Sequence, residues 1–358
     1  MSRRFFGLLL VLVFVLAVPY RSPAPLIYRP GEGWTYEPVG SEGKWQRTRA
    51  KEQLEVAQTA FDKKDYKLAQ KAAKRVVRVW PLSDYAPQAQ YLVARCYEER
   101  GQSEKAFAEY QKVLEKQPKS ANFEDILQRQ FKIANLYLAG KWFKLWGVIP
   151  IFSSMDKTAA MYEKIVRNGP YSDVAPQAQM NIGAAREKQK NYPMAAKAYE
   201  LAADRYHDRQ PIASDALYRE GLAYKKQAQT AEYDQSTAGQ AIATFTDFLA
   251  LYPADSRVAD AQKTITTLKS EQARGSFETA KFYEKYKRWR GALVYYNEVL
   301  LLDPNSKFAN QARVRIDELN RRTLGTPQSP KPPKPTKPPE FLDLPQPSTP
   351  PKSPEPPK

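Results

Sequence analysis

The stretch that decides the fold runs from residue 50 to residue 83 and reads AKEQLEVAQTAFDKKDYKLAQKAAKRVVRVWPLS. A second stretch, from residue 87 to residue 120, reads PQAQYLVARCYEERGQSEKAFAEYQKVLEKQPKS. Residues of the same kind recur 37 positions apart in the two stretches, namely Ala57 and Ala94, Ala69 and Ala106, Val76 and Val113, and Pro81 and Pro118. The chain therefore contains an internal repeat whose units are rich in helix-forming residues and close with proline.

The same frame returns further along the chain. It includes Gly183, Tyr192, Ala195, Tyr199 and Ala202 in one copy, and Ala280, Tyr283, Trp289, Ala292, Tyr296, Val299 and Pro304 in another. Two less regular copies carry extra residues between their helices and begin near Phe131 and Tyr218. The pattern resembles the tetratricopeptide repeat and predicts an all-α solenoid of about five to six helix pairs. Because no segment alternates apolar and polar residues for long, we expect no sheet.

The small residues of the frame allow the two helices of each pair to pack closely. In a tetratricopeptide array the first helix of each pair lines the groove, so exposed positions on the first two such helices are candidate partner contacts. These candidates are Leu54, Gln58, Phe61, Gln88, Tyr91, Arg95 and Glu98.

The ends of the chain differ from the repeats in composition. Residues 1–24 contain Arg3 and Arg4 before an apolar run from Phe5 to Val18, which is typical of a secretory signal peptide. Residues 25–46 combine prolines, glycines and aromatics and predict an extended arm that either packs along the repeats or contacts a partner. Residues 47–322 are predicted to form the repeat domain, and residues 323–358 are a tail rich in proline and lysine. The tail is either a solubilising spacer or a segment that docks on a partner through residues 341–344.

An aromatic insertion interrupts the third unit between residues 141 and 152. Its rings are Trp142, Phe143, Trp146 and Phe152, and Lys141 and Lys144 lie among them. Rings beside lysines suit a membrane interface, whereas the same rings also suit partner contact or internal packing. We therefore keep a membrane surface as a candidate partner.

Residues that would support catalysis are scarce. The chain has one histidine, His207, one cysteine, Cys96, and no glycine-rich phosphate loop. We expect no cofactor, no metal and no enzymatic activity. The formal net charge of +17 favours acidic partners, and export makes nucleic acid an unlikely one, so none is predicted.

A narrower resemblance rests on the segment Pro-x-Ser-Asp-x-Ala-Pro-Gln-Ala-Gln, which occurs at residues 81–90 and again at residues 170–179. Over residues 47–322 the chain resembles BamD, also called YfiO, of the outer-membrane assembly machinery. The resemblance implies a periplasmic scaffold at the outer membrane that binds a BamA-like protein, other assembly-complex subunits and unfolded outer-membrane protein segments. The alternative is a YbgF-like adaptor of peptidoglycan and envelope processes. No cysteine lies just after the apolar run, so we expect membrane attachment by means other than the usual lipid.

Overall fold

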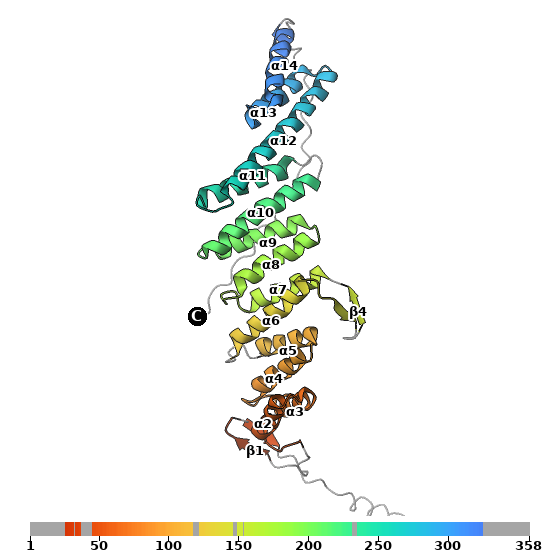
Figure 1. Ribbon diagram of the computed structural model, residues 1–358, viewed down its shortest axis with the longest axis vertical. Coiled ribbons are helices and arrows are strands. Elements are labelled where there is room, and N and C mark those ends of the chain that lie inside the picture. The colour runs from red at the N-terminus through yellow and green to blue at the C-terminus, as the bar shows by residue number, and fades with distance from the viewer. Residues whose placement is uncertain are drawn as a thin grey trace, which may run out of the picture. The chain divides into compact units, whose positions relative to one another are not determined.

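The computed structural model describes residues 26–31, 33–36, 45–116, 122–145, 149–152, 154–230 and 235–324. The predicted signal peptide and nearly all of the predicted tail lie outside these ranges. Helices dominate the described residues, and two short hairpins accompany them (Figure 1). The predicted all-α repeat fold is confirmed.

The helices follow the predicted frame in pairs. The first helices of the pairs are α2 (Ala50–Asp62), α4 (Ala86–Glu99), α6 (Phe123–Leu138), α8 (Ala175–Lys188), α10 (Gln210–Thr230) and the long helix α12 (Val258–Lys285). Their second helices are α3 (Tyr66–Val79), α5 (Ser103–Lys116), α7 (Met155–Asn168), α9 (Tyr192–Arg205), α11 (Gln235–Leu251) and α13 (Trp289–Leu302). A final helix, α14 (Lys307–Leu324), packs on α13.

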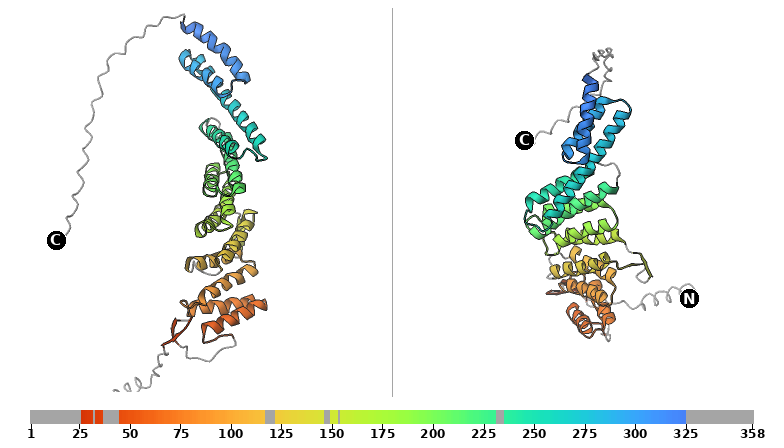
Figure 2. Two further views of the ribbon diagram at one scale, coloured as in Figure 1. Left: turned by 90° about the vertical axis from the view of Figure 1, so that its left-hand side faces the viewer. Right: turned by 45° about the horizontal axis from the view of Figure 1, so that its top comes forward.

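The chain divides into two compact units, Met1–Gln272 and Ala273–Lys358. In the first unit, helices α2 to α5 and α6 to α11 each pack mainly on their neighbours in the chain, as Figure 2 lets the reader follow. The first helices also contact one another, α2 with α4 and α8 with α10, and so share one face, here called the first-helix face. In the second unit, the end of α12 packs with α13 and α14 around Ala280, Tyr296 and Leu319.

A left-handed residue separates the first helix from the second in several pairs. Lys64, Lys190 and Lys287 have positive φ angles of 61°, 59° and 59°, and Gly101 has 70° at the same place in its pair. Side chains then cap the following helices: Asp65 accepts a hydrogen bond from the Leu68 amide at 3.1 Å, and Asn191 from Met194 at 3.3 Å. This turn directs the second helix back along the first.

Small residues occupy the closest approach within the pairs. Ala57, Ala94 and Ala280 are fully buried. At Gly183 even a methyl group would lie 2.4 Å from the ring of Tyr199, and at Gly221 it would lie 2.9 Å from the ring of Phe245. The aromatic side chain of the second helix therefore sits directly against the backbone of the first.

The expectation of no sheet is wrong. Strands β1 (Leu26–Arg29) and β2 (Gly33–Tyr36) form one antiparallel hairpin, and β3 (Phe143–Leu145) and β4 (Ile149–Phe152) form another. Strands of three or four residues are too short to show a sustained alternation. The first hairpin turns at Gly31, whose carbonyl accepts a hydrogen bond from the Asp84 amide at 2.8 Å.

The end of the predicted arm packs on the repeats. Trp45 lies against the core of α2 and α3, and the Lys71 ammonium lies 4.5 Å from the centre of its ring. The backbone carbonyl of Trp45 accepts a hydrogen bond from the buried Gln53 side chain at 3.2 Å. This part of the arm is therefore held on the first helix pair.

Two glycine substitutions test the packing argument. Gly183→Ala should lower the free energy of unfolding by about 1 to 3 kcal/mol, because the added methyl overlaps the Tyr199 ring. Gly239→Ala, on α11, should raise it by about 0.5 to 1 kcal/mol, because the nearest described atom lies 4.0 Å from the added methyl and alanine favours a helix. Urea unfolding followed by circular dichroism measures both, and equal effects at the two sites would contradict the packing.

Candidate functional site

The predicted groove residues lie on α2 and α4 and differ in their surroundings. Leu54 and Phe61 are half-buried against the core of the first pairs. Gln58 is exposed and donates a hydrogen bond to Asp62 at 3.1 Å, and Gln88 is exposed at the start of α4. The other three, Tyr91, Arg95 and Glu98, are half-buried and belong to one connected set of side chains.

That set joins three helices. The Tyr91 hydroxyl donates to Asp125 of α6 at 2.5 Å. The Arg129 Nε donates to the same carboxylate at 2.8 Å, and its Nη1 donates to Glu98 at 3.2 Å. Glu98 also accepts a hydrogen bond from the fully buried Tyr110 of α5 at 2.5 Å. Tyr91, Glu98, Tyr110, Asp125 and Arg129 are here called the α4–α6 network.

Arg95 extends this network toward α2. Its guanidinium lies 5.3 Å from the centre of the Phe61 ring and donates to the Tyr91 hydroxyl at 3.4 Å. It also forms an ion pair with Glu99 at 3.3 Å. The structure thus brings Phe61, Tyr91, Arg95 and Glu98 together on the first-helix face, with positive, negative and aromatic groups side by side.

The network assigns protonation states. Burial and the hydrogen bond to Glu98 raise the pKa of Tyr110, so its hydroxyl stays a donor. Burial acts to raise the pKa of Asp125, but the hydrogen bonds from Arg129 and Tyr91 outweigh it, and the pKa is lowered. At neutral pH Asp125 is therefore an anion and Tyr110 a neutral phenol.

Sequence reasoning missed Tyr110, Asp125 and Arg129. A recurring spacing between a glutamate and a tyrosine does indicate part of the network. A glutamate lies 12 residues before the buried tyrosine in three pairs, and the tyrosine donates to it at 2.5 Å, 2.8 Å and 2.8 Å: Glu98 with Tyr110, Glu187 with Tyr199, and Glu284 with Tyr296. In the third pair Tyr162 donates instead to Asn135 at 2.5 Å. A recurring tyrosine therefore ties the second helix to the last turn of the first.

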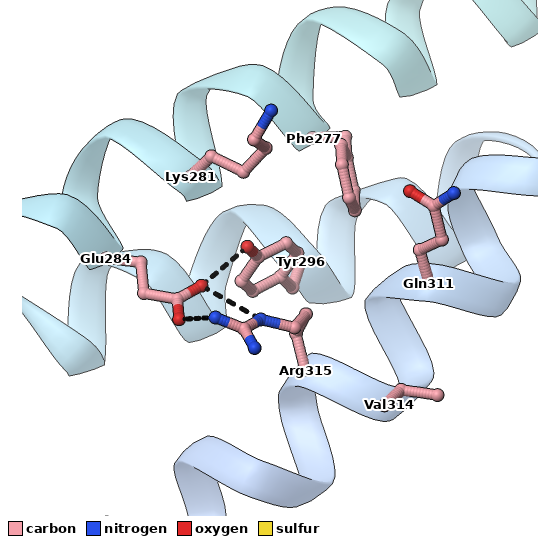
Figure 3. A pocket seen from close by; sticks show the side chains of 7 residues that line it. All are labelled: Phe277, Lys281, Glu284, Tyr296, Gln311, Val314 and Arg315. Atoms are coloured by element: carbon pink, nitrogen blue, oxygen red, sulfur yellow. Dashed lines mark hydrogen bonds and ion pairs between the residues drawn. The ribbon is translucent and has the colours of Figure 1, made fainter.

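The second unit contains a pocket of about 430 Å³, at the position in the repeat that the α4–α6 network occupies in the first unit (Figure 3). Phe277, Lys281 and Glu284 line it from α12, Tyr296 from α13, and Val314 and Arg315 from α14. Arg315 donates to Glu284, which also accepts from Tyr296, as the dashed lines show. The polar end of the pocket is thus neutralised, whereas Val314 is 58% exposed at its apolar side.

The aromatic insertion is divided between surface and interior. Trp142 is 54% exposed. Phe143 is buried and stacks on Tyr137 of α6 with ring centres 4.2 Å apart, and Lys157 lies 5.2 Å from its ring. Trp146 and the side chain of Phe152 lie outside what the structure describes. Phe143 holds the hairpin on α6, and of the two described rings of the insertion Trp142 is the exposed one.

A buried carboxyl on α10 stands apart from these networks. Glu220 is 7% exposed, and its partner is the Thr244 hydroxyl of α11 at 3.5 Å. Burial, together with Glu200 and Asp204 of α9 and Asp247 of α11, raises its pKa to about 7. Between pH 4.5 and about 7 the folded chain therefore keeps a proton on Glu220 that the unfolded chain has released.

Removing one hydroxyl tests the α4–α6 network. Tyr110→Phe should lower the free energy of unfolding by about 1 kcal/mol, because Glu98 loses a buried donor. Tyr171→Phe is the matched control, since Tyr171 is 88% exposed, and its effect should stay within about 0.5 kcal/mol. Urea unfolding measures both, and a Tyr110→Phe chain as stable as the control would show that the bond contributes nothing.

A pH series tests Glu220. Its folded-state pKa is raised, so its stabilising contribution is complete below pH 4.5 and falls as pH rises toward about 7. Glu220→Gln should abolish this slope and raise the free energy of unfolding at pH 8 by up to about 3 kcal/mol. Glu278→Gln, at a glutamate that is 54% exposed, should leave the slope as it is. A wild-type slope retained in Glu220→Gln would disprove the assignment.

Two known protein families match different parts of the chain. Residues 153–321 match the YfiO family, described as outer membrane lipoprotein, and residues 54–121 match a tetratricopeptide-repeat family. A search of curated proteins gives no significant match. Within the described residues, no helix is both long and apolar enough to cross a membrane.

Solved structures with distant similarity include tetratricopeptide-repeat proteins and a type IV pilus biogenesis factor. The C-terminal part of a tetratricopeptide-repeat protein of Cytophaga hutchinsonii is 15% identical, with 74% of this chain and 87% of that chain covered and a TM-score of 0.32. MamA of Desulfovibrio magneticus RS-1 is 15% identical, with 60% and 99% covered and a TM-score of 0.30. PilW, a type IV pilus biogenesis factor, is 15% identical, with 73% and 97% covered and a TM-score of 0.25. At these TM-scores the family matches alone carry the assignment.

Proposed function

Because the chain is a BamD/YfiO-like tetratricopeptide-repeat protein, we propose that it is a non-catalytic scaffold of outer-membrane β-barrel assembly. In this proposal it works in the periplasm at the outer membrane and binds a BamA-like protein and segments of unfolded barrel precursors. The match of residues 153–321 to the outer membrane lipoprotein family carries the proposal.

The first-helix face supports it physically. Three successive first helices present half-exposed aromatic and charged side chains along one surface. These side chains include Phe61, Arg95 and Arg129. Arginines and aromatic rings contribute much of the binding energy at protein interfaces. Their internal bonds hold them in one arrangement, so a partner would meet a preformed surface and lose little side-chain entropy on binding.

Crosslinking tests which surface binds. A photoreactive residue is placed at Gln58 or Gln88, both exposed on the first-helix face, in a tagged full chain made in its own cells. The matched controls are Lys67 and Lys112, exposed on the second helices α3 and α5. We expect crosslinks to a BamA-like partner or a barrel precursor from Gln58 and Gln88 and none from the controls.

Two results would contradict the proposal. Purification of the tagged chain from envelope membranes without a BamA-like protein would remove the assembly function. Recovery of peptidoglycan-binding proteins instead would favour the envelope adaptor. Crosslinks only from Lys67 and Lys112 would leave the function standing and move the binding surface to the second helices.

A further inference from the structure

The pocket of the second unit occupies the same place in the repeat as the α4–α6 network of the first. Every side chain that lines it has a counterpart 186 residues earlier. The paired residues are Tyr91 and Phe277, Arg95 and Lys281, Glu98 and Glu284, Tyr110 and Tyr296, Asp125 and Gln311, Gln128 and Val314, and Arg129 and Arg315. The two places share the glutamate, the buried tyrosine and the arginine that join three helices.

Two of the four positions at which they differ are those that bridge the first helices. In the first unit the Tyr91 hydroxyl and the Asp125 carboxylate meet at 2.5 Å and close the space between α4 and α6. In the second unit Phe277 has no hydroxyl and Gln311 has no charge, and the space between α12 and α14 is open as the pocket. Arg315 takes its second carboxylate from Glu318 of α14 at 2.6 Å, and position 311 holds an uncharged amide.

The open pocket therefore suits a ligand with large apolar side chains. Arg315 and Lys281 already pair with carboxylates of their own unit, whereas an apolar side chain would cover Phe277 and the exposed Val314. The surrounding unit adds long-range attraction, because residues 273–324 contain eleven Lys and Arg against six Asp and Glu. The ligand chemistry is an acidic segment with large apolar residues.

The chain itself carries one such segment. Residues 340–344 read Glu-Phe-Leu-Asp-Leu, and Phe341, Leu342 and Leu344 are the only large apolar residues after Leu324. Prolines precede and follow the segment at positions 339 and 345. We propose that residues 340–344 dock in the pocket lined by Phe277, Val314 and Arg315, so that the chain covers its own site.

The connection is long enough for this contact. Fifteen residues lie between Leu324, the end of α14, and Glu340, and such a length spans up to about 50 Å when extended. Val314 lies ten residues before the end of α14, which is about 15 Å along the helix. The segment therefore reaches the pocket of its own chain without strain. A partner with an acidic apolar segment would have to displace it.

A peptide titration tests the proposal on the full chain. The probe is a fluorescent peptide of residues 336–347, TKPPEFLDLPQP. The receptor is either the wild-type chain or a chain with Phe341→Ser, Leu342→Ser and Leu344→Ser, which empties the pocket. Anisotropy should show at least tenfold tighter binding to the emptied chain, because the tethered segment competes at an effective concentration on the order of millimolar.

Pocket substitutions in the emptied chain locate the binding. Gln311→Asp should weaken peptide binding at least tenfold, because it places a negative charge in the pocket that repels Glu340 and Asp343 of the peptide. Val314→Glu should do the same by placing a charge against the apolar residues. Val294→Glu is the matched control, since Val294 is 65% exposed on α13 and does not line the pocket, and it should leave binding unchanged.

Three outcomes would overturn the proposal. The first is equal affinity for the wild-type and emptied chains, the second is binding that survives both Gln311→Asp and Val314→Glu, and the third is equal binding of a peptide with the same residues in scrambled order. The last would mean that the basic unit attracts any acidic peptide. Circular dichroism of each variant verifies that the helices are intact.

Discussion

The structure depends on a close contact, repeated in several helix pairs, between an aromatic ring of the second helix and a small residue of the first. Tyr199 against Gly183 and Phe245 against Gly221 leave no room for a further carbon atom. The contact brings the two helices together and buries the ring, so a tyrosine at this place must find an acceptor for its hydroxyl. The last turn of the first helix supplies it through Glu98, Glu187 or Glu284.

This buried acceptor also organises the surface. A carboxylate held near a tyrosine in the interior requires a cation, and the next first helix provides Arg129 to Glu98 and Arg315 to Glu284. Packing therefore accounts for the charged groups of the first-helix face, whether or not a partner binds them. A scaffold built in this way offers a partner a fixed pattern of rings and charges at low entropic cost.

The two ends of the repeat domain use that pattern differently. In the first unit Tyr91 and Asp125 close the surface into a connected network. In the second unit Phe277 and Gln311 leave the same place open. Four of the seven lining positions differ between the two places, and the change from Tyr91 and Asp125 to Phe277 and Gln311 removes the hydrogen bond that joins successive first helices.

The amino-acid sequence by itself determined the helix pairs, since the spacing of Ala94, Gly183 and Ala280 expresses a packing rule that acts within one pair. It did not reveal the short hairpins, because three or four residues carry too little pattern. Nor did it reveal that Asp125 and Arg129 complete the site begun by Tyr91 and Glu98, since these residues lie on different helices and meet only when one pair stacks on the next. Contacts within a pair follow from local periodicity, whereas the network and the pocket arise from stacking between pairs, which only the tertiary structure decides.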